Sequence, residues 1–210
     1  MERNHERRID YLQKLRQIVK VSGFQNVVYV DESGFDPHTY RPYAWSLRGK
    51  KSHGNRWGRG GVRTNLIAGK RGKEFLAPVL YEGSTSAVWF NQWFEAHLLK
   101  ELNPNSTIIM DNAAFHKKEE IRAMAEAAGH TVLFLPPYSP DFNPIEQDFA
   151  TLKKIRQNAP LNTSIDHIVK SYGTFLERLY IPFLSSLDGL LLQQSTGLST
   201  HLCLIPRNLH

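Results

Sequence analysis

The chain has 210 residues, of which 41% are hydrophobic and 22% are charged, and it carries a formal net charge of +6. This composition is ordinary for a soluble globular protein of one sizeable domain. The single cysteine, Cys203, excludes an internal disulfide and a cysteine-based zinc site, and the absence of any apolar run of about 18 residues excludes a membrane span. The charged N-terminus is followed by no signal-peptide core, so we expect a reducing, cytoplasmic setting.

Hydrophobic periods typical of strands and of helices alternate along the chain. The expected elements, in chain order, are a helix at 6–20, strands at 26–31, 64–69 and 74–83, a helix at 86–102 opened by Ser84 or Ser86, a strand at 106–111, a helix at 117–129, a strand at 130–136, a proline-rich turn and a helix at 145–157. This order predicts an α/β fold, in which helices pack on a mixed sheet.

A basic stretch, residues 41–73, follows the first expected strand and includes the second. It contains no Asp or Glu, and Tyr43, Trp45 and Trp57 are interleaved with its glycines. Such a stretch suits a nucleic acid, because cations neutralise phosphates and rings stack on bases. The alternative is a solvated hairpin. The ten basic residues are Arg41, Arg48, Lys50, Lys51, Arg56, Arg59, Arg63, Lys70, Arg71 and Lys73.

The composition changes near Arg178. Residues 179–210 contain ten leucines, with Asp188 as their one acid and Arg207 as their one base. Their periodicity is poor. We therefore divide the chain into a linker helix (1–24), a catalytic domain (25–177) and an atypical leucine-rich tail (178–210), which we interpret as read-through, out-of-frame or disordered sequence.

Three carboxylates are candidates for a metal site. Two predicted strands end on aspartates, Asp31 and Asp111, and Glu146 follows in the first turn of a helix. Groups at the carboxyl ends of strands gather at one edge of an α/β sheet. Three such carboxylates could hold two Mg²⁺ ions roughly 3.5–4 Å apart, one to activate the attacking water or hydroxyl and one to stabilise the leaving oxygen.

Each of these acids also has a purely structural interpretation. Asp31 could begin a turn, and Asp111 could cap the next helix. Glu146 could complete a capping box in which Asn143 is the N-cap and Pro144 the first helical residue. Asp148 competes with Glu146 as the third acid, but two residues are about 200° around a helix, so it should face elsewhere.

Further basic residues lie close to these acids in the sequence. Lys153 and Lys154 follow Glu146 on the same predicted helix and could contact a DNA backbone, although a solvated helix face is the alternative. His116 follows Asp111 and could contact a phosphate or orient a group near the metals. A structural histidine is equally consistent with its position.

Three motifs, "YVDES", "MDNAAFH" and "LPPYSPDFNPIEQDFATLKK", occur in this order between residues 29 and 154. In order and spacing they resemble the catalytic domain of Asp-Asp-Glu transposases of the Tc1/mariner superfamily, with the bacterial insertion-sequence branch as the nearest likeness. The resemblance covers roughly residues 25–177. It implies a ribonuclease H-like fold with a mixed five-stranded sheet flanked by helices, and a catalytic, metal-binding triad of Asp31, Asp111 and Glu146.

The resemblance also implies an activity and its partners. Mg²⁺, with Mn²⁺ as a substitute, would support cleavage of transposon-end DNA and strand transfer into target DNA, typically at a TA dinucleotide. Asp31 would bridge two ions, Asp111 would hold one and Glu146 the other. A homodimer in the bacterial cytoplasm, associated with the nucleoid, is expected. The residues expected to contact DNA are Arg48, Lys50, Lys51, Arg56, Arg59, His116, Lys153 and Lys154.

The chain departs from the family pattern at both ends. No helix-turn-helix modules precede the catalytic domain, so we expect an upstream chain or reading frame to supply them. The alternative is a catalytically silent DNA-binding remnant, or an inhibitor of a full-length transposase. Another ribonuclease H-like nuclease, such as a Holliday-junction resolvase, would share the fold but not the proline-rich motif.

Overall fold

A computed structural model describes residues 5–38, 47–48, 50, 60–112, 117–160 and 162–172. The elements are α1 (His5–Ser22), η1 (Phe24–Asn26), β1 (Val27–Phe35), β2 (Thr64–Arg71), β3 (Glu74–Glu82), α2 (Ala87–Trp93), η2 (Phe94–Leu98), α3 (Leu99–Glu101), β4 (Thr107–Met110), α4 (Lys118–Ala127), β5 (Thr131–Phe134), η3 (Pro140–Phe142), α5 (Ile145–Asn158) and α6 (Ile165–Ser171). The expected tail at 178–210 lies outside the described residues.

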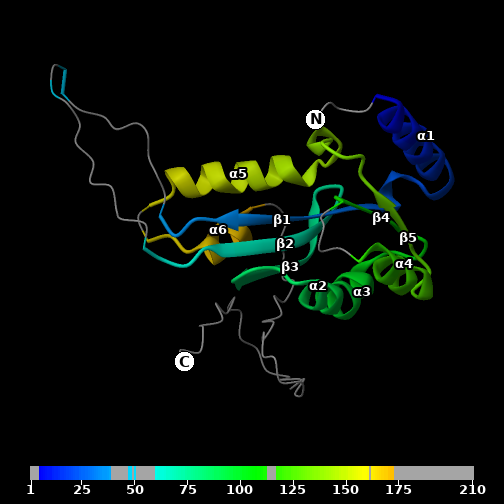
Figure 1. Cartoon of the computed structure of the whole chain (residues 1–210). Coiled ribbons are helices and arrows are strands. Elements are labelled where there is room, and N and C mark those ends of the chain that lie inside the picture. Colours follow the sequence, from blue (N-terminus) through cyan, green and yellow to red (C-terminus); the bar gives the residue numbers. More distant parts are fainter. Residues whose placement is uncertain are drawn as a thin grey trace, which may run out of the picture.

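The five strands form one mixed sheet in the order β3-β2-β1-β4-β5 (Figure 1). The three strands β1, β2 and β3 are antiparallel neighbours, and β1, β4 and β5 run parallel. A short hairpin joins β2 to β3, whereas the parallel strands β4 and β5 require a longer crossover, which α4 supplies. The predicted mixed five-stranded sheet flanked by helices is therefore confirmed.

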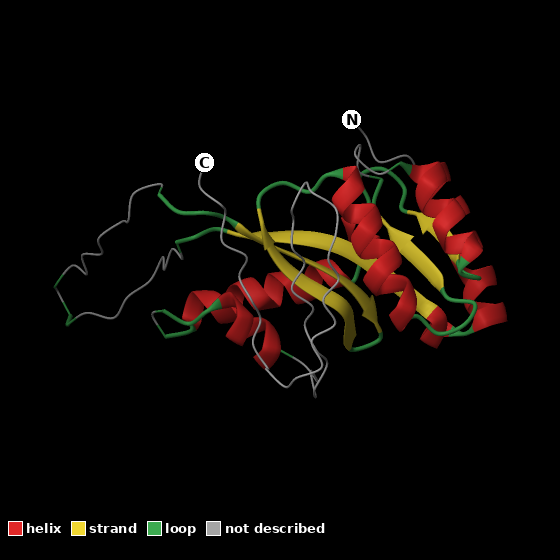
Figure 2. Cartoon of the chain, turned by 90° about the horizontal axis from the view of Figure 1, so that it is seen from below, coloured by secondary structure: helices red, strands yellow, loops and turns green. Residues whose placement is uncertain are grey.

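Helices cover both faces of the sheet (Figures 1 and 2). Strand residues alternate between two apolar clusters, as a period of two requires. Val28 and Val30 of β1 join the cluster that contains residues of α2, η2 and α4. Val27 and Tyr29 join the opposite cluster, with residues of α1, α5 and α6. The face of the sheet under α5 is the one that carries the candidate site.

Strand β1 is longer than the sequence predicts. It continues through Asp31 to Phe35, because β2 pairs with it in antiparallel register as far as Phe35 and Thr64. Its parallel partner β4 ends earlier, at the pair Val30 and Met110. The prediction that the strand ends on Asp31, and the alternative that Asp31 begins a turn, are therefore wrong. Asp31 marks the point where β1 loses one of its two neighbours.

The predicted helix at 86–102 is one helical run with a π-helical middle, α2–η2–α3. Ser86 is its N-cap, since its side chain accepts a hydrogen bond from the Trp89 N–H at 3.2 Å. Val88 is 66% exposed, whereas Phe90 is buried. The Trp93 indole donates to the Ala77 carbonyl at 2.9 Å, at a register shift between β2 and β3.

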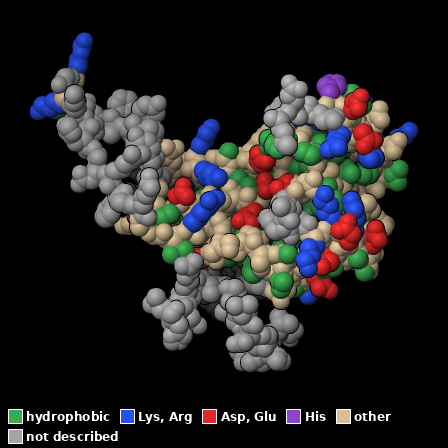
Figure 3. Space-filling model, in the orientation of Figure 1, with side chains coloured by type: hydrophobic (Ala, Val, Ile, Leu, Met, Phe, Trp, Pro, Cys, Tyr) green, Lys and Arg blue, Asp and Glu red, His purple; other side chains and the backbone are tan. Residues whose placement is uncertain are grey.

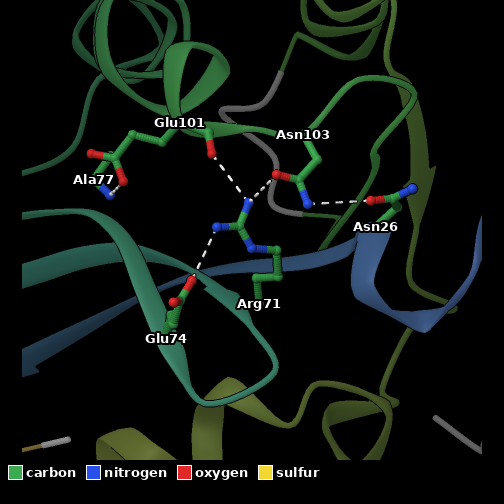
Figure 4. Close-up of polar contacts among 6 residues, drawn as sticks. All are labelled: Asn26, Arg71, Glu74, Ala77, Glu101 and Asn103. Carbon is green, nitrogen blue, oxygen red and sulfur yellow. Dashed lines mark hydrogen bonds and ion pairs between the residues drawn. The ribbon is translucent and has the colours of Figure 1, made fainter. Parts of the chain in front are cut away.

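Arg71 ties the β2–β3 hairpin to the segment that leads into β4 (Figure 4). Its guanidinium contacts the Glu101 carbonyl and the Asn103 side-chain oxygen at 3.2 Å each, and the Glu74 carboxylate at 3.0 Å. The Glu101 carboxylate in turn accepts the Ala77 N–H at 3.1 Å. This network lies at the β2–β3 turn, where Arg71 pairs with Glu74. Among the described residues, no helix is long and apolar enough to cross a membrane.

Candidate active site

Asp31 and Asp111 are neighbours because their strands are. In the parallel register of β1 and β4 the last pair is Val30 and Met110, and the next residue on each chain is an aspartate. Asp31 continues the row of Val27 and Tyr29, so its side chain lies on the α5 face of the sheet. Asp111, the first residue after β4, is exposed. The backbone register alone therefore brings two of the three predicted acids together.

Glu146 reaches this edge from the first turn of α5. It is exposed, while Ile145 and Phe149 beside it are buried against the sheet. The capping-box alternative is wrong, since no side-chain hydrogen bond caps α5. The amide of Asn143, the predicted cap, is buried and has no hydrogen-bond partner among the described residues. The Glu146 carboxylate is thus not used by its own helix N-terminus.

The charges of the three acids act on one another. Burial in the first place, together with the charges of Asp111, Glu146 and Glu32, raises the pKa of Asp31 to about 7. One hydrogen bond opposes this shift, from the Glu32 N–H to Asp31 Oδ1 at 2.7 Å. Burial also raises the pKa of Glu146, followed by the charges of Asp111 and Asp141. Mutual repulsion of this kind is relieved by a cation.

The donor set fits a hard divalent ion. All three candidate ligands are carboxylates, and Mg²⁺ prefers oxygen ligands while keeping positions for water and phosphate. In the described ranges, no three His, Cys, Asp or Glu side chains are already gathered closely enough to surround one ion. The site is therefore a set of electrostatically coupled carboxylates rather than a closed metal cage.

Asp148 fixes α5 to its neighbours and is not one of the candidate metal ligands. Its carboxylate pairs with the Lys70 ammonium of β2 and accepts the Tyr172 hydroxyl at 2.7 Å. The prediction that Asp148 faces away from Glu146 is confirmed. Asp148 is therefore held by Lys70 and Tyr172, whereas the charge of Glu146 raises the pKa of Asp31.

Few of the predicted DNA contacts can be placed. Arg48 and Lys50 are described and exposed, as are Lys153 and Lys154 on α5. Lys and Arg side chains lie beside Asp and Glu side chains on the surface along which α5 runs (Figure 3). Basic groups beside a carboxylate site suit a phosphodiester substrate. The other four predicted contacts, Lys51, Arg56, Arg59 and His116, lie outside the described residues.

Two sets of residues that support the site were not predicted. The Glu32 side chain accepts the Thr85 hydroxyl, which is itself 2.5 Å from the Tyr81 hydroxyl. This contact anchors the residue whose N–H orients Asp31. In the second set, the Arg8 guanidinium of α1 donates hydrogen bonds to Ser139 and Asp141 in the proline-rich turn (residues 136–144) before α5. These pairs are far apart in the chain, and no local sequence pattern indicates them.

Comparison with solved structures confirms the ribonuclease H-like fold. A Mos1 strand transfer complex is 22% identical, with a TM-score of 0.63, covering 81% of this chain and 54% of that one. A Mos1 paired-end complex with the left transposon end is 20% identical, with a TM-score of 0.61, covering 78% of this chain and 52% of that one. The chain thus spans about half the length of these relatives. The Mos1 catalytic domain alone is 18% identical, with a TM-score of 0.53, covering 78% of each chain.

The fold defines a class, the ribonuclease H-like α/β domains. The family profile described as "DDE superfamily endonuclease" matches residues 26–168, which is more than half of the chain. The chain therefore belongs to the DDE superfamily endonuclease family. A comparison with curated proteins finds no match.

Proposed function

We propose that the chain is the catalytic domain of a Tc1/mariner-type DDE transposase of the bacterial insertion-sequence branch. It would cleave transposon-end DNA and transfer the freed strand into target DNA. One observation carries this proposal: Asp31 and Asp111 each follow the last residue pair of the parallel strands β1 and β4, and Glu146 lies in the first turn of α5, which packs on the same face of the sheet. Membership of the DDE superfamily endonucleases and the fold shared with Mos1 transposase complexes support it.

The proposed cofactor is a pair of divalent ions, Mg²⁺ or Mn²⁺. Mos1 structures with Mg and with Mn support this choice. Asp31 would contact both ions, Asp111 one and Glu146 the other. When bound, the ions would supply an activated water or 3′-hydroxyl and stabilise the leaving oxygen. The chain itself would supply the three carboxylates from β1, from the residue after β4 and from α5, and the Glu32 N–H, which donates to Asp31 Oδ1, would hold the orientation of that carboxylate.

The proposed partner is double-stranded DNA, as transposon ends and as a target with a TA dinucleotide. Lys153, Lys154, Arg48 and Lys50 would contact its phosphates, together with the four basic residues outside the described ranges. A homodimer would work on paired ends, with helix-turn-helix modules supplied by an upstream chain or reading frame. This assembly would act in the cytoplasm, in association with the nucleoid.

The test is Asp111→Asn, because this change removes a charge from an exposed residue and leaves the strands intact. With a labelled transposon-end duplex and Mn²⁺, we expect wild-type cleavage and a loss of at least about 100-fold in the variant. Asp10→Asn, an exposed acid of α1 distant in sequence, is the matched control. Cleavage by Asp111→Asn at the wild-type rate would overturn the triad. DNA binding by the wild type without cleavage would favour the silent-remnant alternative.

A further inference from the structure

Helix α1 is joined to the proline-rich turn by one guanidinium. Arg8 Nη1 donates to Ser139 Oγ at 2.8 Å and to Asp141 Oδ1 at 3.1 Å, and Nη2 lies 2.5 Å from Asp141 Oδ2. The Arg8 Cζ atom lies 4.0 Å from the centroid of the Phe142 ring. A bidentate guanidinium–carboxylate pair fixes direction as well as distance, which an ammonium does not. Arg8 therefore holds three residues of the turn at once.

Tyr11 strengthens the same contact from the same face of α1. It lies three residues after Arg8, so the two side chains are neighbours on the helix surface. Its ring stacks on Phe142 with centroids 5.3 Å apart and an interplanar angle of 15°. Tyr11 is 3% exposed, which makes it the buried residue of α1. Phe142 thus receives both an arginine and an aromatic ring from α1.

A series of backbone hydrogen bonds connects the proline-rich turn to Glu146. The Phe142 N–H donates to the Ser139 carbonyl at 3.1 Å, and the Asn143 N–H donates to the Pro140 carbonyl at 2.8 Å. The Glu146 N–H then donates to the Asn143 carbonyl at 3.2 Å. No side chain caps α5, so the segment before it and the packing of Ile145 on the sheet together position its first turn.

We propose that Arg8 and Tyr11 form a clasp on the proline-rich turn that sets the position of the Glu146 carboxylate relative to Asp31 and Asp111. Arg8 is thus a positioning residue that acts through Asp141, Ser139 and Phe142. This inference rests on the proposed function, because it assigns a role in metal use to a helix expected to serve only as a linker. A merely structural contact would affect stability without affecting the metal requirement.

The experiment compares Arg8→Met with Lys14→Met in the full chain. Lys14 pairs with Asp10 on the same helix, and both side chains are well exposed, so it matches the charge change without touching the turn. Three quantities are measured: the free energy of unfolding in urea, amide exchange of the peptide covering 139–147 without metal, and the Mn²⁺ concentration that gives half-maximal cleavage of a transposon-end duplex.

For Arg8→Met we expect an increase of about tenfold or more in the half-maximal Mn²⁺ concentration, as typical of residues that support metal ligands. Amide exchange at 139–147 should also become about tenfold faster. Lys14→Met should change neither. Arg8→Lys should fall between wild type and Arg8→Met, because one ammonium cannot contact Ser139 and both Asp141 oxygens together.

Equal Mn²⁺ requirements and equal exchange in Arg8→Met and Lys14→Met would overturn the clasp. If Arg8→Met does not fold, Arg8→Lys and Asp141→Asn decide, since both keep most of the packing, and unchanged behaviour of both would overturn it equally. Absence of Mn²⁺-dependent cleavage in the wild type would instead contradict the proposed function. The exchange measurement without metal would then still decide whether Arg8 orders the turn.

Discussion

Lys70 on β2 and Asp148 on α5 form an ion pair that joins the sheet to the helix, although the two residues lie 78 positions apart in the chain. Both side chains are largely buried, with 17% and 16% of their surface exposed. The Tyr172 hydroxyl donates to the second oxygen of the Asp148 carboxylate. Burial, followed by the contact with this carboxylate, raises the pKa of Tyr172 to about 12. These contacts therefore hold the middle of α5 on the sheet, separately from the first turn that carries Glu146.

Substituting Glu146 and Asp148 one at a time should distinguish an effect on DNA cleavage from an effect on stability. Glu146→Gln should abolish Mn²⁺-dependent cleavage and leave the free energy of unfolding nearly unchanged. Asp148→Asn should retain cleavage but destabilise the fold by about 2 kcal/mol, because it leaves Lys70 without its counter-charge. Urea unfolding and a cleavage assay on both variants measure this. Loss of activity in Asp148→Asn at a temperature where the fold is intact would contradict the assignment.

The stability of the metal-free protein should fall as pH rises from about 4 to about 7. The pKa of Asp31 is raised from 3.8 to about 7, so in this window the native state binds more protons than the unfolded chain and unfolding becomes easier with each rise in pH. The whole effect is on the order of 4 kcal/mol at most.

Urea unfolding in EDTA at pH 4.5 and pH 8 measures this dependence. Asp31→Asn should flatten it and make the metal-free chain more stable at pH 8, whereas Asp10→Asn, an exposed acid, should leave it as in the wild type. If the free energy of unfolding of the wild type increased over this pH range, the pKa of Asp31 would not be raised in the folded protein.

Arg71 should be irreplaceable by lysine. Arg71→Met should lower the free energy of unfolding by about 1.5 kcal/mol, because the Glu101 carbonyl and two side chains lose a charged donor. Arg71→Lys should recover less than half of this loss, since one ammonium cannot reach three acceptors in different directions. Lys73→Met, an exposed change in the same hairpin, should stay within about 0.5 kcal/mol of the wild type. If Arg71→Lys had the same free energy of unfolding as the wild type, the positive charge alone, and not the geometry of the guanidinium, would account for the contact.

Trp93→Phe should lower the free energy of unfolding by more than the smaller side chain alone would explain. Trp93 is fully buried and its indole satisfies the Ala77 carbonyl, so the variant leaves a buried acceptor unpaired at a cost of about 2 kcal/mol. Phe94→Leu removes part of another fully buried ring that carries no polar atom, and serves as the control for volume. Equal losses in the two variants would mean that the indole hydrogen bond contributes nothing.

The strands and helices were predictable because their periodicity is local. The sequence also separates Glu146 from Asp148, since helical geometry alone places them on different faces. The extent of β1 was not predictable: whether the chain turns at Asp31 or continues depends on how far β2 pairs with it, which is a tertiary property. Helix α6 was missed, although Ser164 caps it and accepts the His167 N–H.

The supporting contacts of the site were beyond sequence patterns for the same reason. Arg8 and Asp141 lie 133 residues apart, and either would be read as a solvated charge in isolation. Likewise Val88 and Phe90 are both apolar, and which of them is buried depends on how α2 sits on the sheet. Sequence reasoning therefore found the residues proposed to do the chemistry and missed those that hold them in place.

The three acids are held by two different kinds of restraint. The spacing of Asp31 and Asp111 follows from the hydrogen-bonded register of β1 and β4, which side-chain substitutions hardly alter. The position of Glu146 relative to this pair depends on the proline-rich turn that Arg8 and Tyr11 contact and also on the packing of α5 against the sheet, where Ile109 and Ile145 lie in one apolar cluster. A change of one methylene group in that layer would move one proposed ligand more than the other two. The fit of the proposed site to ions of different radius would then depend on the hydrophobic core as well as on the ligands themselves.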